Sequence, residues 1–129
     1  MDSVKHSLSA LTRAEKLQEK AAELNFDWSD TAGIVAKIKE ETSEVETALA
    51  DNDDDAIDEE LGDLLFAVIN LIRYRKRSRS EDLLRRANGK FEQRFRIMEN
   101  EAENAGLELA DLSAEQLDSL WEKAKNTEK

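Results

Sequence analysis

The sequence predicts an all-α protein built as a single domain, and three observations support this. The chain of 129 residues has no proline, only four glycines and 5% aromatic residues, whereas a β-sandwich or barrel needs regular turn residues. Apolar residues recur at spacings of three and four along most of it. A composition of 40% hydrophobic and 38% charged residues suits a helix-rich domain that can bury a core.

The first half of the chain predicts two helices. Apolar residues spaced by three and four predict an amphipathic helix over Ser7–Leu24, and the segment Asn25–Asp30 interrupts the pattern. Asp30 or Thr31 can cap a second helix that runs to about Ala50. The residues expected to face inward from this second helix are Ile34, Ile38, Val45 and Leu49.

A third helix is predicted from about Ala56 to Lys76, after an acidic connector over Asp51–Asp55. Its segment Leu61–Tyr74 is apolar nearly all round rather than along one stripe. A helix of this kind is buried on several sides. We therefore expect it to be either the central helix of the fold or shared with a second subunit, and we favour a dimer.

Two more helices are predicted in the last part of the chain. The fourth starts near Ser80 and stops before Gly106. A short final helix starts at Ser113, where SAEQ matches a capping box. The apolar line of the fourth helix consists of Leu84, Ala87, Phe91, Phe95 and Met98.

Composition also excludes several classes of function. The chain has no cysteine, and its single histidine, His6, lies in a segment (residues 1–7) that we predict to be a mobile tail, so zinc and haem sites are disfavoured. A net charge of −11 disfavours binding to nucleic acid or anionic lipid. No apolar run of about 18 residues and no cleavable leader is present, so we expect a cytoplasmic protein without a membrane partner.

Charge is segregated along the middle of the chain. The segment Glu40–Asp63 holds twelve Asp and Glu and no Lys or Arg, whereas Arg73–Arg96 holds ten Lys and Arg against three Asp and Glu. The first block contains two carboxylate pairs at i, i+3, which share a helix face: Glu41 with Glu44, and Glu60 with Asp63. If their two helices are antiparallel, four carboxylates can meet around Mg²⁺ or Mn²⁺. The alternative is a solvated acidic face.

Asp63 is the most informative single residue of this block. It lies in an otherwise apolar helix beside Gly62, where an ionised carboxylate is costly unless it is paired or bound to a cation. A salt bridge to an arginine of the fourth helix explains it equally well. Glycine inside a helix costs about 1 kcal/mol relative to alanine, so Gly62 indicates close backbone packing or an approaching ligand.

Groups suited to binding a nucleotide lie elsewhere in the chain. Lys90 and Arg94 are four residues apart and share a helix face, as phosphate binding requires. Trp28 and Trp121 can stack on a nucleobase or can anchor a core. We expect Phe91 and Phe95 to belong to the core. No phosphate-binding loop, dinucleotide fingerprint, nucleophile elbow or zincin motif is present.

The order of these motifs resembles a known family. EETSE (40–44), followed after fifteen residues by ELGD, matches the EExxE…ExxD signature of the all-α nucleoside triphosphate pyrophosphohydrolases. Three surrounding blocks are similar to the MazG type: KLQEKAAELNFDW (16–28), EELGDLLFAVINLIR (59–73) and LLRRANGKFEQRFRIME (83–99). The resemblance covers residues 8–125, so the chain (1–129) looks like one MazG domain with a short extra C-terminal helix.

The resemblance implies a four-helix core that forms a dimer or a dimer of dimers. It also implies Mg²⁺-dependent hydrolysis of a nucleoside triphosphate between the α and β phosphates, which yields a monophosphate and pyrophosphate. Two departures from the family pattern bear on base preference or rate: Asn25 replaces a Gly before FDW, and Ala56 stands where some members carry a Lys.

The resemblance also assigns roles to individual residues. By motif, the metal ligands are Glu41, Glu44, Glu60 and Asp63; residues lining the nucleotide site are Lys37, Glu40, Asn88, Lys90 and Arg94; and Trp121 contacts the base. Glu40 and Glu41 are both candidates for the carboxylate that takes the proton of the attacking water. Two alternatives stay open: a narrower enzyme acting on dUTP, dCTP or phosphoribosyl-ATP, and a non-catalytic helical module that binds a partner.

Overall fold

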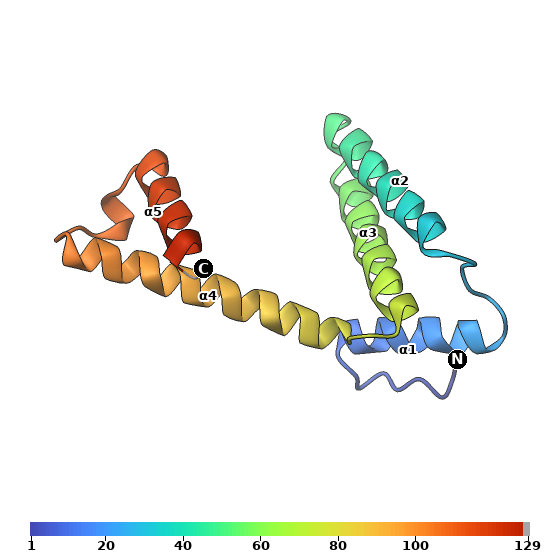
Figure 1. Cartoon of the computed structure of the whole chain (residues 1–129). Coiled ribbons are helices and arrows are strands. Elements are labelled where there is room, and N and C mark those ends of the chain that lie inside the picture. The colour runs from blue at the N-terminus through green and yellow to red at the C-terminus, as the bar shows by residue number, and fades with distance from the viewer. Residues whose placement is uncertain (128–129) are drawn as a thin grey trace. The chain divides into compact units, whose positions relative to one another are not determined.

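The computed structural model describes residues 1–127, and its regular elements are helices, with no β-strand among these residues (Figure 1). The all-α prediction is therefore confirmed. The elements are α1 (Ala10–Glu23), α2 (Thr31–Ala50), α3 (Asp54–Arg75), α4 (Ser80–Asn104), a 3₁₀ turn η1 (Leu109–Asp111) and α5 (Ala114–Thr127). No described helix is both long enough and apolar enough to cross a membrane.

The chain divides into two compact units, Met1–Leu83 and Leu84–Lys129, and the division falls inside α4. The assignment of residues 1–129 to a single domain stays a prediction. So does the mobility of residues 1–7, although Val4 is buried.

In the first unit, α2 and α3 form an antiparallel hairpin, and α1 packs against α3 (Figure 1). Asp30 caps α2 by accepting a hydrogen bond of 2.9 Å from the Gly33 backbone N–H, as predicted. Asp53 caps α3 in the same way through the Ala56 N–H at 3.2 Å. Because Asp53 is the cap, α3 begins at Asp54, slightly earlier than the sequence pattern suggested.

The core of the first unit lies along the hairpin. Ile34 is completely buried, and Val45 of α2 and Ile69 of α3 are also buried, so the inward orientation predicted for Ile34 and Val45 is confirmed. The prediction for Leu49 is wrong, because its side chain is 53% exposed. Leu49 lies in the last turn of α2, next to the short connector, where little of the chain is available to cover it.

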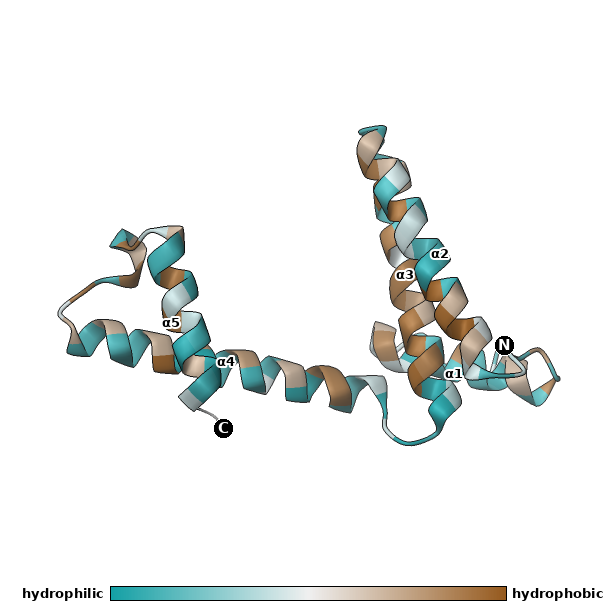
Figure 2. Ribbon diagram, turned by 45° about the horizontal axis from the view of Figure 1, so that its top comes forward, coloured by the Kyte–Doolittle hydropathy of each residue, from teal (hydrophilic) through white to brown (hydrophobic). Residues whose placement is uncertain are grey.

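Only some of the apolar side chains of α3 are buried within the chain. Leu61, Leu65, Phe66 and Val68 are all exposed, and hydrophobic residues follow α3 for most of its length (Figure 2). The alternative that this is the central, enclosed helix of the chain is therefore wrong, and its burial against a second subunit stays a prediction. The physical reason is that α1 and α2 are its main packing partners and leave the remaining face open.

The start of α4 is attached to α1 by a buried carboxylate. Glu15, 2% exposed, accepts hydrogen bonds from the Ser80 backbone N–H and from the Arg79 guanidinium. Burial alone would raise the pKa of Glu15, but these hydrogen bonds lower it below its ordinary value. The predicted helix start at Ser80 is confirmed.

The second unit contains most of α4, together with η1 and α5. Gly106 has φ +70°, and the Leu107 N–H bonds back to the Ala102 carbonyl at 2.8 Å, so α4 ends as predicted. Ser113 and Gln116 form a reciprocal capping box, with N···O distances of 2.9 and 3.2 Å. The predicted start of the final helix is therefore confirmed.

The apolar line of α4 is buried only near its C-terminal end. Met98 is buried, whereas Leu84, Phe91 and Phe95 are exposed. The expectation that both phenylalanines belong to the core is wrong for the single chain. The reason is that α5 is short: the buried residues of this unit, Met98, Ala102 and Ala124, come from the last turns of α4 and the end of α5.

Candidate metal centre and adjoining cleft

Three of the four predicted metal ligands come together. Glu41 of α2 and Glu60 and Asp63 of α3 each place a carboxylate oxygen within 4.8 Å of the other two. The antiparallel hairpin brings the two helices side by side, and the i, i+3 spacing puts Glu60 and Asp63 on one face of α3. From spacing and expected helix direction, this cluster and a solvated acidic face were both possible, and the structure brings three of the four carboxylates together.

Glu44 lies beside the cluster rather than within it. It is half-buried one turn beyond Glu41 on α2, and its carboxyl group acts on that of Glu60. This contact, followed by burial and the proximity of Glu41, raises the pKa of Glu60 to about 7. Such a shift is expected where carboxylates crowd together with too little positive charge to balance them.

Lys37 supplies a cation to this group. Its Nζ lies 2.9 Å from a carboxylate oxygen of Glu41 and 3.7 Å from one of Glu40. The contact lowers the pKa of Glu41 and raises that of Lys37. One oxygen of Glu41 and one of Glu60 are nevertheless buried and have no hydrogen-bond partner within residues 1–127.

The donor set suits a hard divalent cation. Three carboxylates from two helices offer oxygen ligands only, which favours Mg²⁺ or Mn²⁺ over Zn²⁺ or Cu²⁺. The two buried oxygens without a partner are groups that a cation would satisfy. The residues present therefore fit the metal that the sequence predicted.

Asp63 differs from the sequence-based description in one respect. It is exposed rather than enclosed by the apolar residues around it, and it forms no ion pair within the first unit. Its carboxylate lies beside that of Glu41 on α2 and lines a cleft. Among residues 1–127, nothing would lie within 4 Å of a side-chain carbon added at Gly62, so those residues do not pack closely there, and the approach of a ligand stays a prediction.

A cleft of about 830 Å³ adjoins the carboxylates. Glu41, Asp63 and Lys37 line it together with residues of α1 and of the connector between α1 and α2. Outside the acidic group the lining is mixed. Its apolar residues are Met1, Leu17, Ala21, Phe26, Trp28, Ile34, Phe66 and Ala67, and its polar ones are Gln18, Asn25, Asp27, Asn70 and Arg73. The carboxylate end therefore continues into a cavity with an apolar part, and Trp28, one of the predicted base-stacking residues, lines it.

Sequence reasoning missed the residues that hold Trp28 in place. Arg73 makes two hydrogen bonds to the Asp27 carboxylate, at 2.7 and 3.1 Å, and a third of 3.1 Å from Nε to Asn70. Asp27 also accepts the Trp28 backbone N–H at 2.8 Å. The hydrogen bonds from Arg73 are the main cause of the lowered pKa of Asp27. The available signal was an arginine closing the apolar run 64–72.

The remaining predicted nucleotide contacts belong to the second unit. There the Arg94 guanidinium lies 5.6 Å from the centre of the Trp121 ring, and Phe91 packs against the same ring at 5.4 Å. Asn88 and Lys90 are exposed on α4. The roles assigned to Asn88, Lys90, Arg94 and Trp121 stay predictions.

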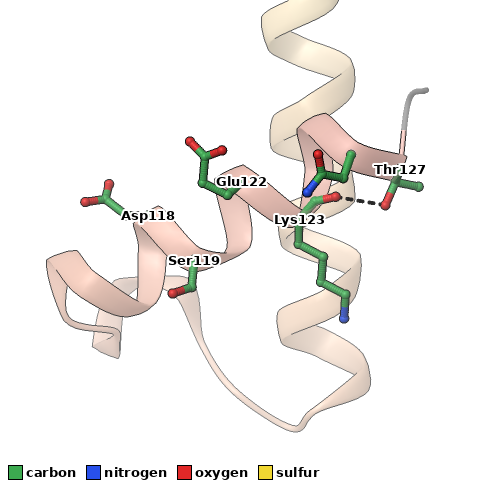
Figure 3. A pocket seen from close by; sticks show the side chains of 6 residues that line it. Asp118, Ser119, Glu122, Lys123 and Thr127 are labelled. Atoms are coloured by element: carbon green, nitrogen blue, oxygen red, sulfur yellow. Dashed lines mark hydrogen bonds between the residues drawn. The ribbon is translucent and has the colours of Figure 1, made fainter.

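The second unit has a hollow of its own on α5. Figure 3 shows its lining side chains, among them Asp118, Glu122 and Lys123, and the hydrogen bond of 2.9 Å from the Thr127 hydroxyl to the Lys123 carbonyl. The lining residues all come from α5, and Glu101 of α4 pairs with one of them, Lys123, at 2.8 Å. We assign no function to this hollow.

Fold and site together define a class: an all-helical protein in which a helical hairpin presents a carboxylate centre to a mixed polar and apolar cleft. Comparison with known families makes this specific. Residues 30–98, which include the whole carboxylate cluster, match the MazG nucleotide pyrophosphohydrolase domain. The chain belongs to this family, as the resemblance indicated.

Curated relatives match most of the chain. The nucleoside triphosphate pyrophosphohydrolase/pyrophosphatase MazG of Thermotoga maritima is 44% identical over 116 residues, covering 90% of this chain and 44% of the relative. The nucleoside triphosphate pyrophosphohydrolase of Escherichia coli K12 is 39% identical over 130 aligned positions, covering 99% of this chain and 49% of the relative. The chain thus spans about half the length of these relatives.

Proposed function

We propose that the protein hydrolyses nucleoside triphosphates between the α and β phosphates and releases a nucleoside monophosphate and pyrophosphate, with Mg²⁺ required. The observation that carries this proposal is the convergence of Glu41, Glu60 and Asp63, of which Glu41 and Asp63 line the cleft. Family membership and the names of the relatives support the same reaction. A role in clearing unwanted nucleotides from the cytoplasm is consistent with it.

The proposed metal ligands are Glu41, Glu44, Glu60 and Asp63. A bound Mg²⁺, which Mn²⁺ can replace, would supply a more acidic water and neutralise charge on the phosphoryl oxygens. Glu40 and Glu41 are the two candidates for accepting the proton of that water. Glu41 is the better placed for a metal, whereas Glu40 is exposed beside Lys37 and is the better placed for a base.

Positive and aromatic groups complete the proposed site. Lys37, Lys90 and Arg94 would contact the phosphates, because a triphosphate needs several converging cations. Asn88 would hydrogen-bond to the nucleotide. Trp28, which lines the cleft, and Trp121 would contact the base or ribose.

We further propose that the protein acts as a homodimer or a dimer of dimers. The exposed apolar residues Leu61, Leu65, Phe66 and Val68 on α3 are what a second copy would cover. Light scattering during size-exclusion chromatography tests this. Leu65→Glu should shift the protein toward the monomer, whereas the exposed Glu46→Gln should leave the assembly unchanged.

Two alternatives make different predictions. A narrower pyrophosphatase, acting on dUTP, dCTP or phosphoribosyl-ATP, keeps the same carboxylates but hydrolyses one member of a substrate panel. A non-catalytic module that binds a protein partner shows neither turnover nor stabilisation by Mg²⁺. The unsatisfied carboxylate oxygens of Glu41 and Glu60 favour the metal-dependent enzyme over the module.

The test is a panel of ribo- and deoxynucleoside triphosphates, incubated with the protein in Mg²⁺ or in EDTA, with products separated by ion exchange. We expect monophosphate and pyrophosphate in Mg²⁺ and neither in EDTA. Diphosphate and phosphate would contradict the proposed bond of cleavage. No product from any nucleotide would favour the binding module.

A further inference from the structure

Helix α3 carries an exposed apolar stripe along one face. Leu61, Leu65 and Val68 follow one another at spacings of four and three residues, so their side chains share a face of the helix. All three are exposed, and Leu65, at the middle of the stripe, is the most exposed at 62%. Ile72, half-buried, continues the spacing toward the C-terminus. A stripe with this spacing is the pattern through which one helix packs against another.

The same stripe ends in charges of opposite sign. Asp54 and Asp58 extend its spacing toward the N-terminus of α3, and Arg75 extends it toward the C-terminus. All three are exposed. They belong to two segments of uniform charge: Asp51–Glu59 holds six acidic residues and no basic one, whereas Arg73–Arg79 holds five basic residues and no acidic one. The exposed face of α3 is therefore acidic at one end, apolar in the middle and basic at the other end.

The two charged ends cannot neutralise each other within one chain. Asp54 and Arg75 are 21 residues apart on a straight helix, about 32 Å at 1.5 Å per residue. Salt screens charges at that separation, because the Debye length is about 8 Å at physiological ionic strength. Neither residue forms an ion pair within residues 1–127, whereas Arg73 and Arg79 of the basic segment are paired with carboxylates of α1 and its connector.

The stripe is nearly symmetric about Leu65. Leu61 and Val68 lie four residues before it and three after it, and Asp54 and Arg75 lie eleven before and ten after. If a second α3 runs in the opposite direction with the two Leu65 side chains face to face, Leu61 meets the partner's Val68. In the same register Asp54 meets the partner's Arg75, and the reverse contacts follow from the two-fold axis. A parallel pair would instead bring like charges together at both ends.

We infer that the open face of α3 binds a second copy of this chain in antiparallel register about Leu65, with the acidic end of each α3 against the basic end of the other. The inference rests on the homodimer proposed above and adds its interface and register. Burial of the apolar stripe supplies most of the association energy. Exposed ion pairs contribute little to affinity, so the charges act chiefly by selecting the direction and register of pairing.

Engineered cysteines test the register, because the chain has no cysteine of its own. A disulfide requires Cβ atoms about 4 Å apart, so it reports close neighbours only. Leu65→Cys should form a covalent dimer on copper-catalysed oxidation, because residue 65 meets its own copy. Leu61→Cys and Val68→Cys should each stay uncross-linked on a denaturing gel, whereas the double variant should form a covalent dimer.

The cross-links distinguish the two directions of pairing. In a parallel pair every residue of the stripe meets its own copy, so Leu61→Cys alone would cross-link, and this result would overturn the inference. Within one chain, residues 61 and 68 are two turns apart, about 10 Å, and cannot form the bond themselves. Glu46→Cys, an exposed position on α2 outside the stripe, is the control and should give no covalent dimer.

Charge reversal tests the contact between the two ends. Asp54→Arg and Arg75→Asp should each raise the dimer Kd about tenfold in sedimentation equilibrium, because like charges then meet at both ends of the pair. The double variant should return close to the native Kd, because the opposite charges are restored. Acidic and basic residues also suit the dipole at the two ends of a single helix. If that were their only role, the two reversals would add, and the absence of restoration would contradict the inference.

The outcomes separate this inference from the proposed reaction. The predicted cross-links in a protein that cleaves no nucleotide would support the interface while the proposed reaction fails. A dimer that hydrolyses nucleoside triphosphates but gives no cross-link at Leu65→Cys would overturn the register and leave the reaction standing. A native protein that stays monomeric at every concentration would overturn the proposed homodimer together with this inference.

Discussion

The two ends of the cleft differ in whether their charged side chains are paired within the chain. At one end, Arg73 is buried against Asp27 and Asn70, and each charged group has its hydrogen bonds from within the chain. At the other end, Glu41, Glu60 and Asp63 meet with Lys37 as their neighbouring cation, and two of their oxygens are buried without a partner. Both ends are built on the same hairpin.

This difference indicates that the Arg73 pair stabilises the fold, whereas the carboxylates serve the proposed activity. A charge paired within the chain stabilises the fold and requires nothing from outside. Carboxylates that crowd together with too little positive charge nearby raise one another's pKa, as at Glu60. A bound cation would relieve the repulsion between them. Removing a charge should therefore damage stability at the Arg73 end and activity at the carboxylate end.

The largest effect is expected at the carboxylate end. Asp63→Asn should lower Mg²⁺-dependent hydrolysis by more than about a hundredfold, because a ligand is lost where even supporting residues contribute 10 to 100-fold. Its melting temperature without metal should stay the same or rise, because repulsion is relieved. The control is Glu46→Gln, an exposed carboxylate of α2 outside the cluster. Retained activity in Asp63→Asn would refute the metal assignment.

The Arg73 end should show the reverse pattern. Arg73→Met leaves Asp27 partly buried without its partner and should cost about 3 kcal/mol of unfolding free energy, measured by urea denaturation. Arg96→Met is the control, because the Arg96–Glu92 pair is exposed and worth only about 0.5 kcal/mol. Similar losses in the two variants would show that the Arg73 pair is not the structural contact we describe.

Mg²⁺ should raise the unfolding free energy only by binding at the carboxylate end. At a Mg²⁺ concentration about 100 times Kd, ligand binding adds about 2.7 kcal/mol to the unfolding free energy. Differential scanning fluorimetry should therefore show a higher melting temperature with Mg²⁺ for the native protein and for Glu46→Gln, but not for Asp63→Asn. An equal shift in all three would mean that Mg²⁺ acts elsewhere on the protein.

The smallest expected effect is a pH dependence at Asp27. Arg73 lowers the pKa of this carboxyl in the folded state below its ordinary value of 3.8, so its contribution to stability is present above pH 3.8 and is lost as pH falls toward the lowered pKa. The loss should be smaller than in Arg73→Met, because the protonated carboxyl still accepts a guanidinium N–H. Acid titrations of the native protein and Asp27→Asn should converge in this range; parallel curves would contradict the assignment.

Much of the fold followed from local patterns. Spacings of three and four residues located the helices, and Asp30, Ser113 and Gly106 marked their ends because caps depend on a few neighbouring residues. The carboxylate cluster also followed, since a short connector makes two helices antiparallel and an i, i+3 spacing places Glu60 and Asp63 together.

Other features depended on which surfaces the chain happens to cover. Leu49, Phe91 and Phe95 have apolar side chains at helical spacing, yet all three are exposed. Even the contact of Phe91 with the Trp121 ring leaves most of that phenylalanine uncovered. Periodicity predicts which face of a helix is apolar, but it does not say whether a neighbour is present. The same limit applies to the open face of α3.

The sequence by itself determined the helices, their caps and the acidic centre, because these rest on contacts between residues close in sequence or one short turn apart. Only the tertiary structure decided what the centre opens onto. The contacts of Gln18 with Phe66 and of Arg73 with Asp27 join residues 48 and 46 positions apart. Such pairings depend on how α1 and its connector pack against α3, a choice that no local pattern encodes.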